Sequence, residues 1–149
     1  YYGEELPINF IKGRDRAYYS SYEDKIVVPH CSQFKNINEY YMSILHEMIH
    51  STGSSKRLKR FSENETKVFG DDKYSKEELV AEIGASMLKA YLGIEDESTD
   101  NNSIAYLKGW YNQIKNGNVN DITYSSQQAQ KAMNYIIEKV EELKLKVVS

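Results

Sequence analysis

The sequence predicts an α+β domain in which a small N-terminal antiparallel sheet is followed by four helices. Short apolar segments separated by turn residues occupy the first 30 residues, and apolar residues recur at helical spacing from Asn36 onward. Strands and helices therefore occupy separate parts of the chain, as in other α+β domains. A length of 149 residues suits one folding unit, so residues 1–149 are expected to form a single domain.

Three short strands are predicted, from Ile8 to Ile11, from Arg16 to Tyr19 and from Lys25 to Val28. The segments between them are polar and carry turn residues. Pro29 cannot donate a backbone hydrogen bond, so we expect it to end the third strand and to leave this strand at the edge of the sheet. An edge strand offers free backbone groups to an extended peptide.

The helical part of the chain contains four amphipathic segments. They run from Asn36 to Gly53, from Lys76 to Tyr91, from Ser103 to Lys115 and from Ser125 to Leu145. Asn36 followed by Glu39 resembles a capping box, and Gly53 is typical of a helix end. The polar, basic connection from Ser54 to Lys73 is long for a structureless loop, so we expect part of it to be ordered or functional.

The composition limits the class of protein. Hydrophobic residues make up 40% and charged residues 28%, and no apolar run approaches the roughly 20 residues of a membrane-spanning helix. A net charge of −3 is unlike the basic surface of a nucleic-acid-binding module, so nucleic acid is not an expected partner of this domain alone. Cys31 is the single cysteine, which excludes an internal disulfide and fits the cytoplasm. The missing initial Met predicts that the chain is part of a longer protein.

The clearest functional signal is His46-Glu47-Met48-Ile49-His50, within the first predicted helix. Two histidines four residues apart project from one face of a helix, so both imidazoles can bind the same ion. Glu47 lies beside them, where its carboxylate can act as general base on a water that a zinc ion activates. We therefore predict one catalytic zinc ion, with His46 and His50 as ligands and Glu47 as the base.

The third zinc ligand is predicted to be a carboxylate of the second helix, because a catalytic site has three protein ligands. Glu78 and Glu82 lie four residues apart, so one can bind the metal while the other accepts a hydrogen bond from a ligand histidine. Glu78 also fits a capping box with Ser75, in which case Glu82 would be the ligand. Spacing alone leaves both assignments open, and His30 is a weaker candidate.

The order of these residues resembles that of thermolysin-type peptidases. In that group the first acidic residue of the second helix binds zinc, and an acidic residue one turn later supports a histidine. The resemblance implies that Glu78 is the ligand and that Glu82 belongs to the second layer of the site. That group usually has Asp where this chain has Glu82.

Further segments extend the likeness over most of the chain. They are Asp24 to Pro29, His46 to Gly53, Arg57 to Arg60, Phe69-Gly70 and Tyr74 to Ala85. Together they resemble the zincin-like C-terminal domain of ArdC-type antirestriction proteins and of polyvalent proteins of mobile elements. The resemblance implies a zincin fold and a zinc peptidase with a peptide or protein substrate. It also implies a full-length protein with an N-terminal domain that binds single-stranded DNA, which has no counterpart here.

The expected reaction is hydrolysis of a peptide that lies extended along the Lys25 to Val28 strand, with Glu47 as general base. A second group that stabilises the oxyanion is usual in such sites, and the candidates are Tyr74, His30 and Arg57. An alternative function is a zinc-bearing domain with little or no proteolysis that binds a host defence protein. Glu47 favours the enzyme, because a structural zinc site needs no general base.

Overall fold

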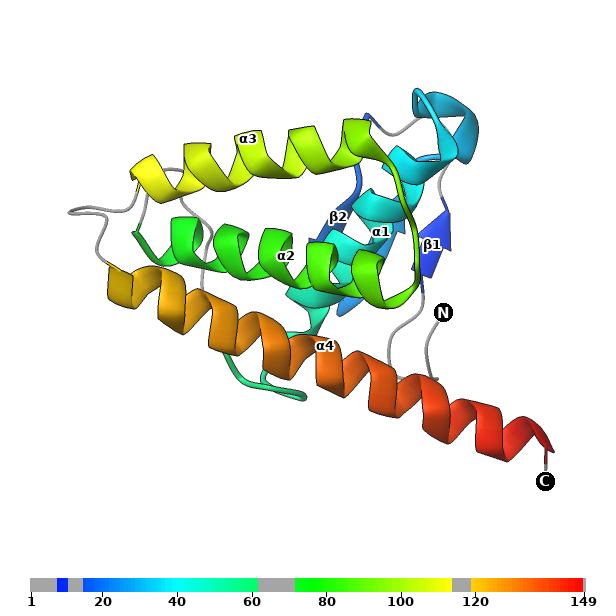
Figure 1. The fold of residues 1–149 in the computed structure, drawn as a ribbon. Coiled ribbons are helices and arrows are strands. Elements are labelled where there is room, and N and C mark those ends of the chain that lie inside the picture. The colour runs from blue at the N-terminus through cyan, green and yellow to red at the C-terminus, as the bar shows by residue number, and fades with distance from the viewer. Residues whose placement is uncertain (1–7, 11–14, 62–71, 114–118, 149) are drawn as a thin grey trace.

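The computed structural model describes residues 8–10, 15–61, 72–113 and 119–148. Within this part of the chain, three strands and a short 3-10 helix precede four α-helices (Figure 1). The elements are β1 Ile8–Phe10, β2 Tyr18–Ser20, β3 Lys25–Val28, η1 Cys31–Gln33, α1 Ile37–Thr52, α2 Asp72–Tyr91, α3 Glu97–Gln113 and α4 Val119–Val148. The predicted α+β class is confirmed.

The sheet has the strand order β1-β3-β2. β2 and β3 are antiparallel as predicted, whereas β1 pairs with β3 in parallel. The expectation that Lys25 to Val28 forms an edge strand is wrong, because β3 lies between the other two. The physical reason is burial: Ile26, Val27 and Val28 are fully buried, and the backbone N–H and C=O groups of a buried strand need hydrogen-bond partners, which β1 and β2 provide on its two edges.

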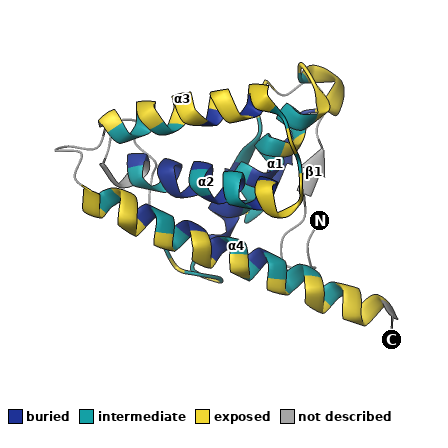
Figure 2. Cartoon of the chain, viewed as in Figure 1, coloured by how far each residue is buried: buried dark blue, intermediate teal, exposed yellow. Residues whose placement is uncertain are grey.

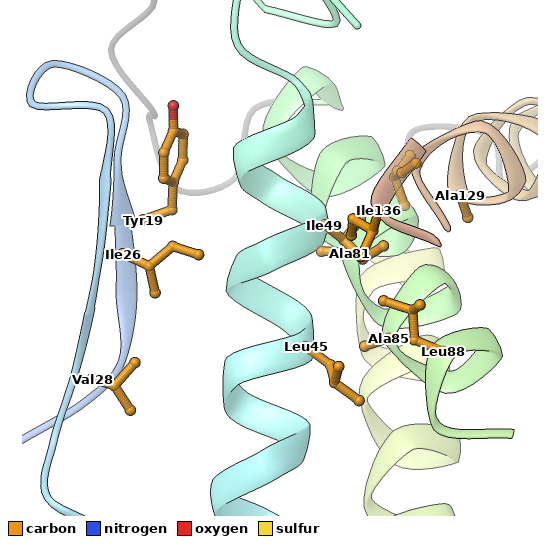
Figure 3. Packing of buried hydrophobic residues seen from close by; sticks show 12 residues of the cluster. Tyr19, Ile26, Val28, Leu45, Ile49, Ala81, Ala85, Leu88, Ala129 and Ile136 are labelled. Atoms are coloured by element: carbon orange, nitrogen blue, oxygen red, sulfur yellow. The ribbon is translucent and has the colours of Figure 1, made fainter. Parts of the chain in front are cut away.

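Helix α1 is packed between the sheet and the other helices. Ile26 and Val28 point from the sheet toward α1, and Leu45 and Ile49 point from its opposite side toward α2 and α4 (Figure 3). Helix α2 contacts α1, α3 and α4 and is the most enclosed helix, whereas α3 is largely exposed (Figure 2). This arrangement buries the face of α2 that turns toward α1.

The last three helices begin earlier than predicted. α2 begins at Asp72, so Ser75 and Glu78 lie inside the helix and the capping-box interpretation of Glu78 is wrong. α3 begins at Glu97 and α4 at Val119, in polar or exposed turns that carry little apolar periodicity. Among the residues that the structure describes, no helix combines the length and the apolar character needed to cross a membrane.

Gly84 permits a close approach of α1 and α2. A Cβ atom at this position would lie 2.7 Å from Cδ1 and 2.9 Å from Cγ1 of Ile49, closer than real Cβ atoms come. Ile49 is fully buried, so it has little room to move away. Because Ile49 directly precedes His50, the spacing of the two helices at Gly84 also sets the distance between their polar side chains.

We predict opposite effects for the same substitution at two helical glycines. Gly84→Ala should lower the free energy of unfolding by about 1–3 kcal/mol, because the added methyl group overpacks Ile49. Gly109→Ala should raise it by about 0.5–1 kcal/mol, because a Cβ there meets no atom within 4 Å and alanine favours the helix. Urea unfolding of both variants measures the difference. Equal effects would contradict the proposed helix contact.

Candidate metal centre

Two adjacent helices bring the predicted metal ligands together. His46 and His50 project from α1, and Glu78 projects from α2 toward them. One ligand atom from each of these residues lies within 4.8 Å of the others. His50 and Glu78 are buried, with 2% and 7% of their surface exposed. Enclosed imidazole and carboxylate groups of this kind form the usual protein ligand set of a catalytic zinc site.

The distances within this group fit a single ion. His46 Nε2 lies 3.3 Å from Glu78 Oε2 and 3.1 Å from His50 Nε2, and His50 Nε2 lies 3.2 Å from Glu78 Oε1. Ligands at about 2.0–2.1 Å from a tetrahedral zinc ion are separated by about 3.3 Å. Both imidazoles also present the same nitrogen, Nε2, to the common point. The residues therefore fit a metal ion without rearrangement of the helices.

The Nδ1 atoms of both histidines face carboxylates on α2. His46 Nδ1 lies 3.2 Å from Glu82 Oε2, and His50 Nδ1 lies 3.1 Å from Glu77 Oε1. A carboxylate at Nδ1 fixes the tautomer and the orientation of the ring, which leaves Nε2 as the metal-binding atom. Glu82 thus lies behind His46, at the place that a supporting carboxylate would occupy. The structure adds Glu77, which the sequence analysis did not identify.

Arg60 holds Glu77 in place. Its guanidinium donates to both carboxylate oxygens of Glu77, at 2.9 and 2.8 Å, and also to the carbonyl oxygen of Ile49 at 2.7 Å. Burial alone would raise the pKa of Glu77, but the hydrogen bonds from Arg60 and His50 outweigh it and lower the pKa to about 2. Glu77 is therefore an ionised acceptor for His50. Only its position directly before Glu78 could have drawn attention to it.

Glu47 lies beside the two histidines and lines the same cavity, whose volume is about 940 Å³. Its Oε2 atom accepts a hydrogen bond of 2.7 Å from the backbone N–H of Tyr19 in β2. Strand β2 thus lies directly alongside the proposed base.

The cavity has two different walls. Residues 15–19, in β2 and the segment before it, form one wall, and one face of α3 forms the other. The residues from α3 are Thr99, Asn102, Ser103 and Tyr106, which are polar and share one face of the helix because the second and third lie three and four positions after the first. The wall formed by α3 therefore offers uncharged polar side chains to the cavity.

The three candidates for an oxyanion contact have different places. The side chain of Tyr74 lies outside the described residues. His30 is exposed and its Nδ1 atom accepts from the backbone N–H of Ser32, where it caps η1. The Arg57 side chain is 2% exposed and pairs with Asp24. Neither His30 nor Arg57 is among the residues that line the cavity, so the structure does not bring them to the metal centre.

Arg57 and Arg60 lie in the connection that follows α1, and both bind carbonyl oxygens of this helix. Residues 54–61 fold back on α1 through hydrogen bonds such as Leu58 N–H to Thr52 O at 2.8 Å. The expectation that part of this connection is ordered is therefore confirmed for residues 54–61, and the remainder to residue 71 lies outside the described residues. Both guanidinium groups form ion pairs with carboxylates of the same chain, Arg57 with Asp24 and Arg60 with Glu77.

A helix with His-Glu-x-x-His, a third ligand from the following helix and a strand alongside together define the zincin class of metallopeptidase folds. Comparison of the sequence with known families agrees with this class. Residues 4–128 match the zincin-like metallopeptidase family, and the chain belongs to this family.

Relatives place the domain in larger proteins. A DNA primase TraC of Escherichia coli is 32% identical over 123 residues, which is 83% of this chain and 8% of that protein. The uncharacterized protein y4eC of Sinorhizobium fredii is 28% identical over 110 residues, or 74% of this chain and 34% of that protein. The chain thus spans about a third or less of these relatives.

Two solved structures have the same fold. The Mn(II)-bound antirestriction protein ArdC from R388 plasmid aligns with 90% of this chain at 30% identity and a TM-score of 0.65. The metal-free structure of ArdC aligns with 92% at 34% identity and a TM-score of 0.69. In both comparisons the match covers 47% of the ArdC chain. The chain is therefore similar to about half of ArdC.

We predict that the three carboxylates of α2 contribute unequally to metal affinity. Glu78→Gln should cause the largest loss, because it replaces a charged ligand by a neutral one. Glu77→Gln and Glu82→Gln should each lower the affinity about 10–100-fold, because they remove the acceptor at Nδ1 of a ligand histidine. Competition with a chromophoric chelator measures these constants. Glu138→Gln, at an exposed position on α4, is the control, and equal affinities for all four variants would contradict the site.

Metal affinity should also depend on pH. Burial lowers the pKa of His46, but its hydrogen bonds to Glu78 and Glu82 and the charge of nearby carboxylates raise it to about 10. His46 therefore carries a proton at neutral pH in the metal-free protein, and a metal ion must displace it. Affinity should rise about tenfold per pH unit between about pH 7 and 9. The same chelator titration tests this, and an affinity independent of pH would exclude proton displacement.

Proposed function

We propose that this chain is a zinc-dependent metallopeptidase domain that hydrolyses a peptide bond in a protein substrate. One observation carries the proposal: His46, His50 and Glu78 converge on a common point beside the Glu47 carboxylate, at an accessible cavity. A site that only stabilised the fold would be closed and would have no use for a general base. The open cavity and Glu47 together favour catalysis.

The proposed metal ligands are His46, His50 and Glu78, with Glu77 and Glu82 behind the two imidazoles. Two nitrogens and a carboxylate oxygen suit zinc, which would polarise the scissile carbonyl and lower the pKa of the attacking water to about 7. One structure of ArdC from R388 plasmid is Mn(II)-bound, which supports a divalent cation as the cofactor of this chain. We propose one zinc ion for this chain.

Glu47 is proposed to move the proton. Its carboxylate takes a proton from the attacking water and later delivers it to the leaving amine. The hydrogen bond from Tyr19 N–H to Oε2 holds the carboxylate toward the cavity. This hydrogen bond leaves Oε1 as the oxygen that handles the proton.

The edge of β2 that faces away from β3, which pairs with no other strand among the described residues, is proposed as the binding site for the substrate backbone. This edge replaces the Lys25 to Val28 strand that the sequence analysis favoured, because both edges of β3 are already paired. The Tyr19 N–H points away from β3 and donates to Glu47, so this edge of β2 faces the metal centre, and the peptide would pair with the other backbone groups of the edge. An extended peptide added to this edge would lie between β2 and the polar face of α3.

The biological setting is proposed from the relatives. ArdC is an antirestriction protein of a plasmid, and we infer a role in antirestriction or mobile-element biology, in the cytoplasm, for this domain within a longer protein. A weakly proteolytic or non-proteolytic domain that binds a host defence protein is the alternative.

Cleavage tests the proposal. Glu47→Gln should lower the rate of peptide cleavage about 10²–10⁴-fold, because it removes the general base, and should leave one metal ion bound. The measurement is mass spectrometry of a proteome-derived peptide mixture incubated with zinc-loaded protein, together with elemental analysis. Glu138→Gln is the matched control, since it makes the same change at an exposed site on α4.

Two outcomes would oppose the proposal in different ways. Undiminished cleavage by Glu47→Gln would assign the base to another group. Absence of cleavage by the zinc-loaded wild type would favour the domain that binds a host defence protein.

A further inference from the structure

Strand β2 is connected to the metal-binding helix at two points. The first is the hydrogen bond of 2.7 Å from Tyr19 N–H to Glu47 Oε2. The second passes through the Tyr19 side chain, whose hydroxyl group lies 3.2 Å from Arg57 Nη2, and Arg57 Nε donates to Ser51 O at 2.7 Å. Glu47 and Ser51 are one turn apart on α1. The two connections therefore close a ring that contains Tyr19 and one turn of the helix.

Asp24 completes this ring. The Tyr19 hydroxyl group donates to Asp24 Oδ1 at 2.6 Å, and Arg57 donates to both carboxylate oxygens of Asp24. Burial raises the pKa of Tyr19 to about 12, and the hydrogen bond to Asp24 acts in the same direction, so the phenol keeps its proton. Asp24 lies in the turn between β2 and β3 with a φ of 49°, a conformation that Asp tolerates better than most residues. The turn thus places a carboxylate where it fixes both partners.

These contacts are buried, which makes them more rigid than surface ion pairs. The side chain of Arg57 is 2% exposed and that of Asp24 is 11% exposed. Tyr19 is 6% exposed and belongs to the hydrophobic core with Ile26. A planar guanidinium with several fixed hydrogen bonds loses little further freedom, so it can hold its neighbours in one geometry.

We propose that Asp24 and Arg57 are positioning residues, which anchor the phenol of Tyr19 so that its backbone N–H holds the Glu47 carboxylate for proton transfer. This inference rests on the proposed function of Glu47. It also gives Arg57 a role different from the oxyanion contact expected from the sequence. None of these three side chains is a proposed metal ligand, so the anchor should act on turnover and not on metal binding.

The alternative is that the anchor stabilises only the fold. A stabilising role would change the free energy of unfolding and leave the Tyr19 N–H to Glu47 hydrogen bond unchanged in the folded protein. A positioning role must change that hydrogen bond. Solvent exchange of the backbone amide at position 19, measured by NMR on the full chain and compared with exchange of the buried Ile49 amide in α1, separates the two. Lower global stability accelerates both amides, whereas loss of the Tyr19 N–H to Glu47 hydrogen bond accelerates only the amide at position 19.

The test uses two tyrosine variants in the same hairpin. Tyr19→Phe removes only the hydroxyl group, and Tyr22→Phe makes the same change at a side chain that is 95% exposed. In Tyr19→Phe the amide at position 19 should exchange about fivefold faster, the factor that corresponds to one hydrogen bond of ordinary strength. Tyr22→Phe should behave as the wild type. Glu47→Ala should accelerate exchange at Tyr19 at least as much, because it removes the acceptor.

Turnover supplies the second measurement. Tyr19→Phe should lower kcat about fivefold with unchanged KM and unchanged metal content, because the substrate edge and the ligands remain in place. Asp24→Asn should have the same effect, and it keeps a residue that tolerates the turn conformation. A fall in metal content parallel to the fall in kcat would overturn the proposal.

Peptide cleavage tests the proposed function, and amide exchange tests the anchor independently of it. If the wild type cleaves no peptide, the proposed function fails, and faster amide exchange in Tyr19→Phe still supports the anchor. If the amide at position 19 exchanges equally fast in Tyr19→Phe, Tyr22→Phe and wild type, the anchor is overturned even when cleavage is observed.

Discussion

A buried cluster of ionisable side chains between α1 and α2 is the constraint on which the rest of the site depends. Its members are His46, His50, Glu77, Glu78 and Glu82. Carboxylates are costly to bury unless cations or hydrogen-bond donors accompany them. Each of these carboxylates lies within hydrogen-bonding distance of an imidazole nitrogen, and a metal ion would add positive charge at their common point. Metal binding and stability should therefore be coupled.

The connection after α1 provides the remaining compensation. Arg60 neutralises Glu77 and binds a carbonyl near the end of α1, while Arg57 binds Asp24 and the carbonyl of Ser51. The two arginines lie three residues apart, and each binds a different carbonyl oxygen near the end of α1. One faces the metal ligands through α2, and the other faces the strand beside the cavity. The basic character of this segment reflects internal pairing more than a surface for nucleic acid.

The packing of the helices also explains why α3 forms the outer wall of the cavity. The sheet and α4 pack against α1 and α2 to form the core. Helix α3 packs mainly on α2 and is largely exposed (Figure 2). At its beginning, α3 is connected to α2 by the ion pair of Lys89 with Asp100. Its polar face is then left to line the cavity opposite β2. A buried metal centre with a more exposed helix as its outer wall would suit the proposed polypeptide substrate.

The sequence alone determined the features that depend on local spacing. Residues four apart on a helix share a face whatever surrounds them, so the joint placement of His46 and His50 was predictable, as was that of Glu78 and Glu82. The α+β order of elements was predictable for the same reason. The family resemblance favoured Glu78 over Glu82 as the ligand, and the start of α2 at Asp72 removes the capping-box alternative for Glu78.

The tertiary structure decided everything that depends on contacts between distant residues. Glu77 meets His50 across 27 positions and Arg57 meets Asp24 across 33, and no periodic pattern encodes such pairs. The central position of β3 likewise depends on which strands cover its two edges. Basic residues in a loop look solvent-exposed in a sequence, and only packing shows that Arg57 and Arg60 are buried, since burial is a property of the neighbours and not of the residue itself.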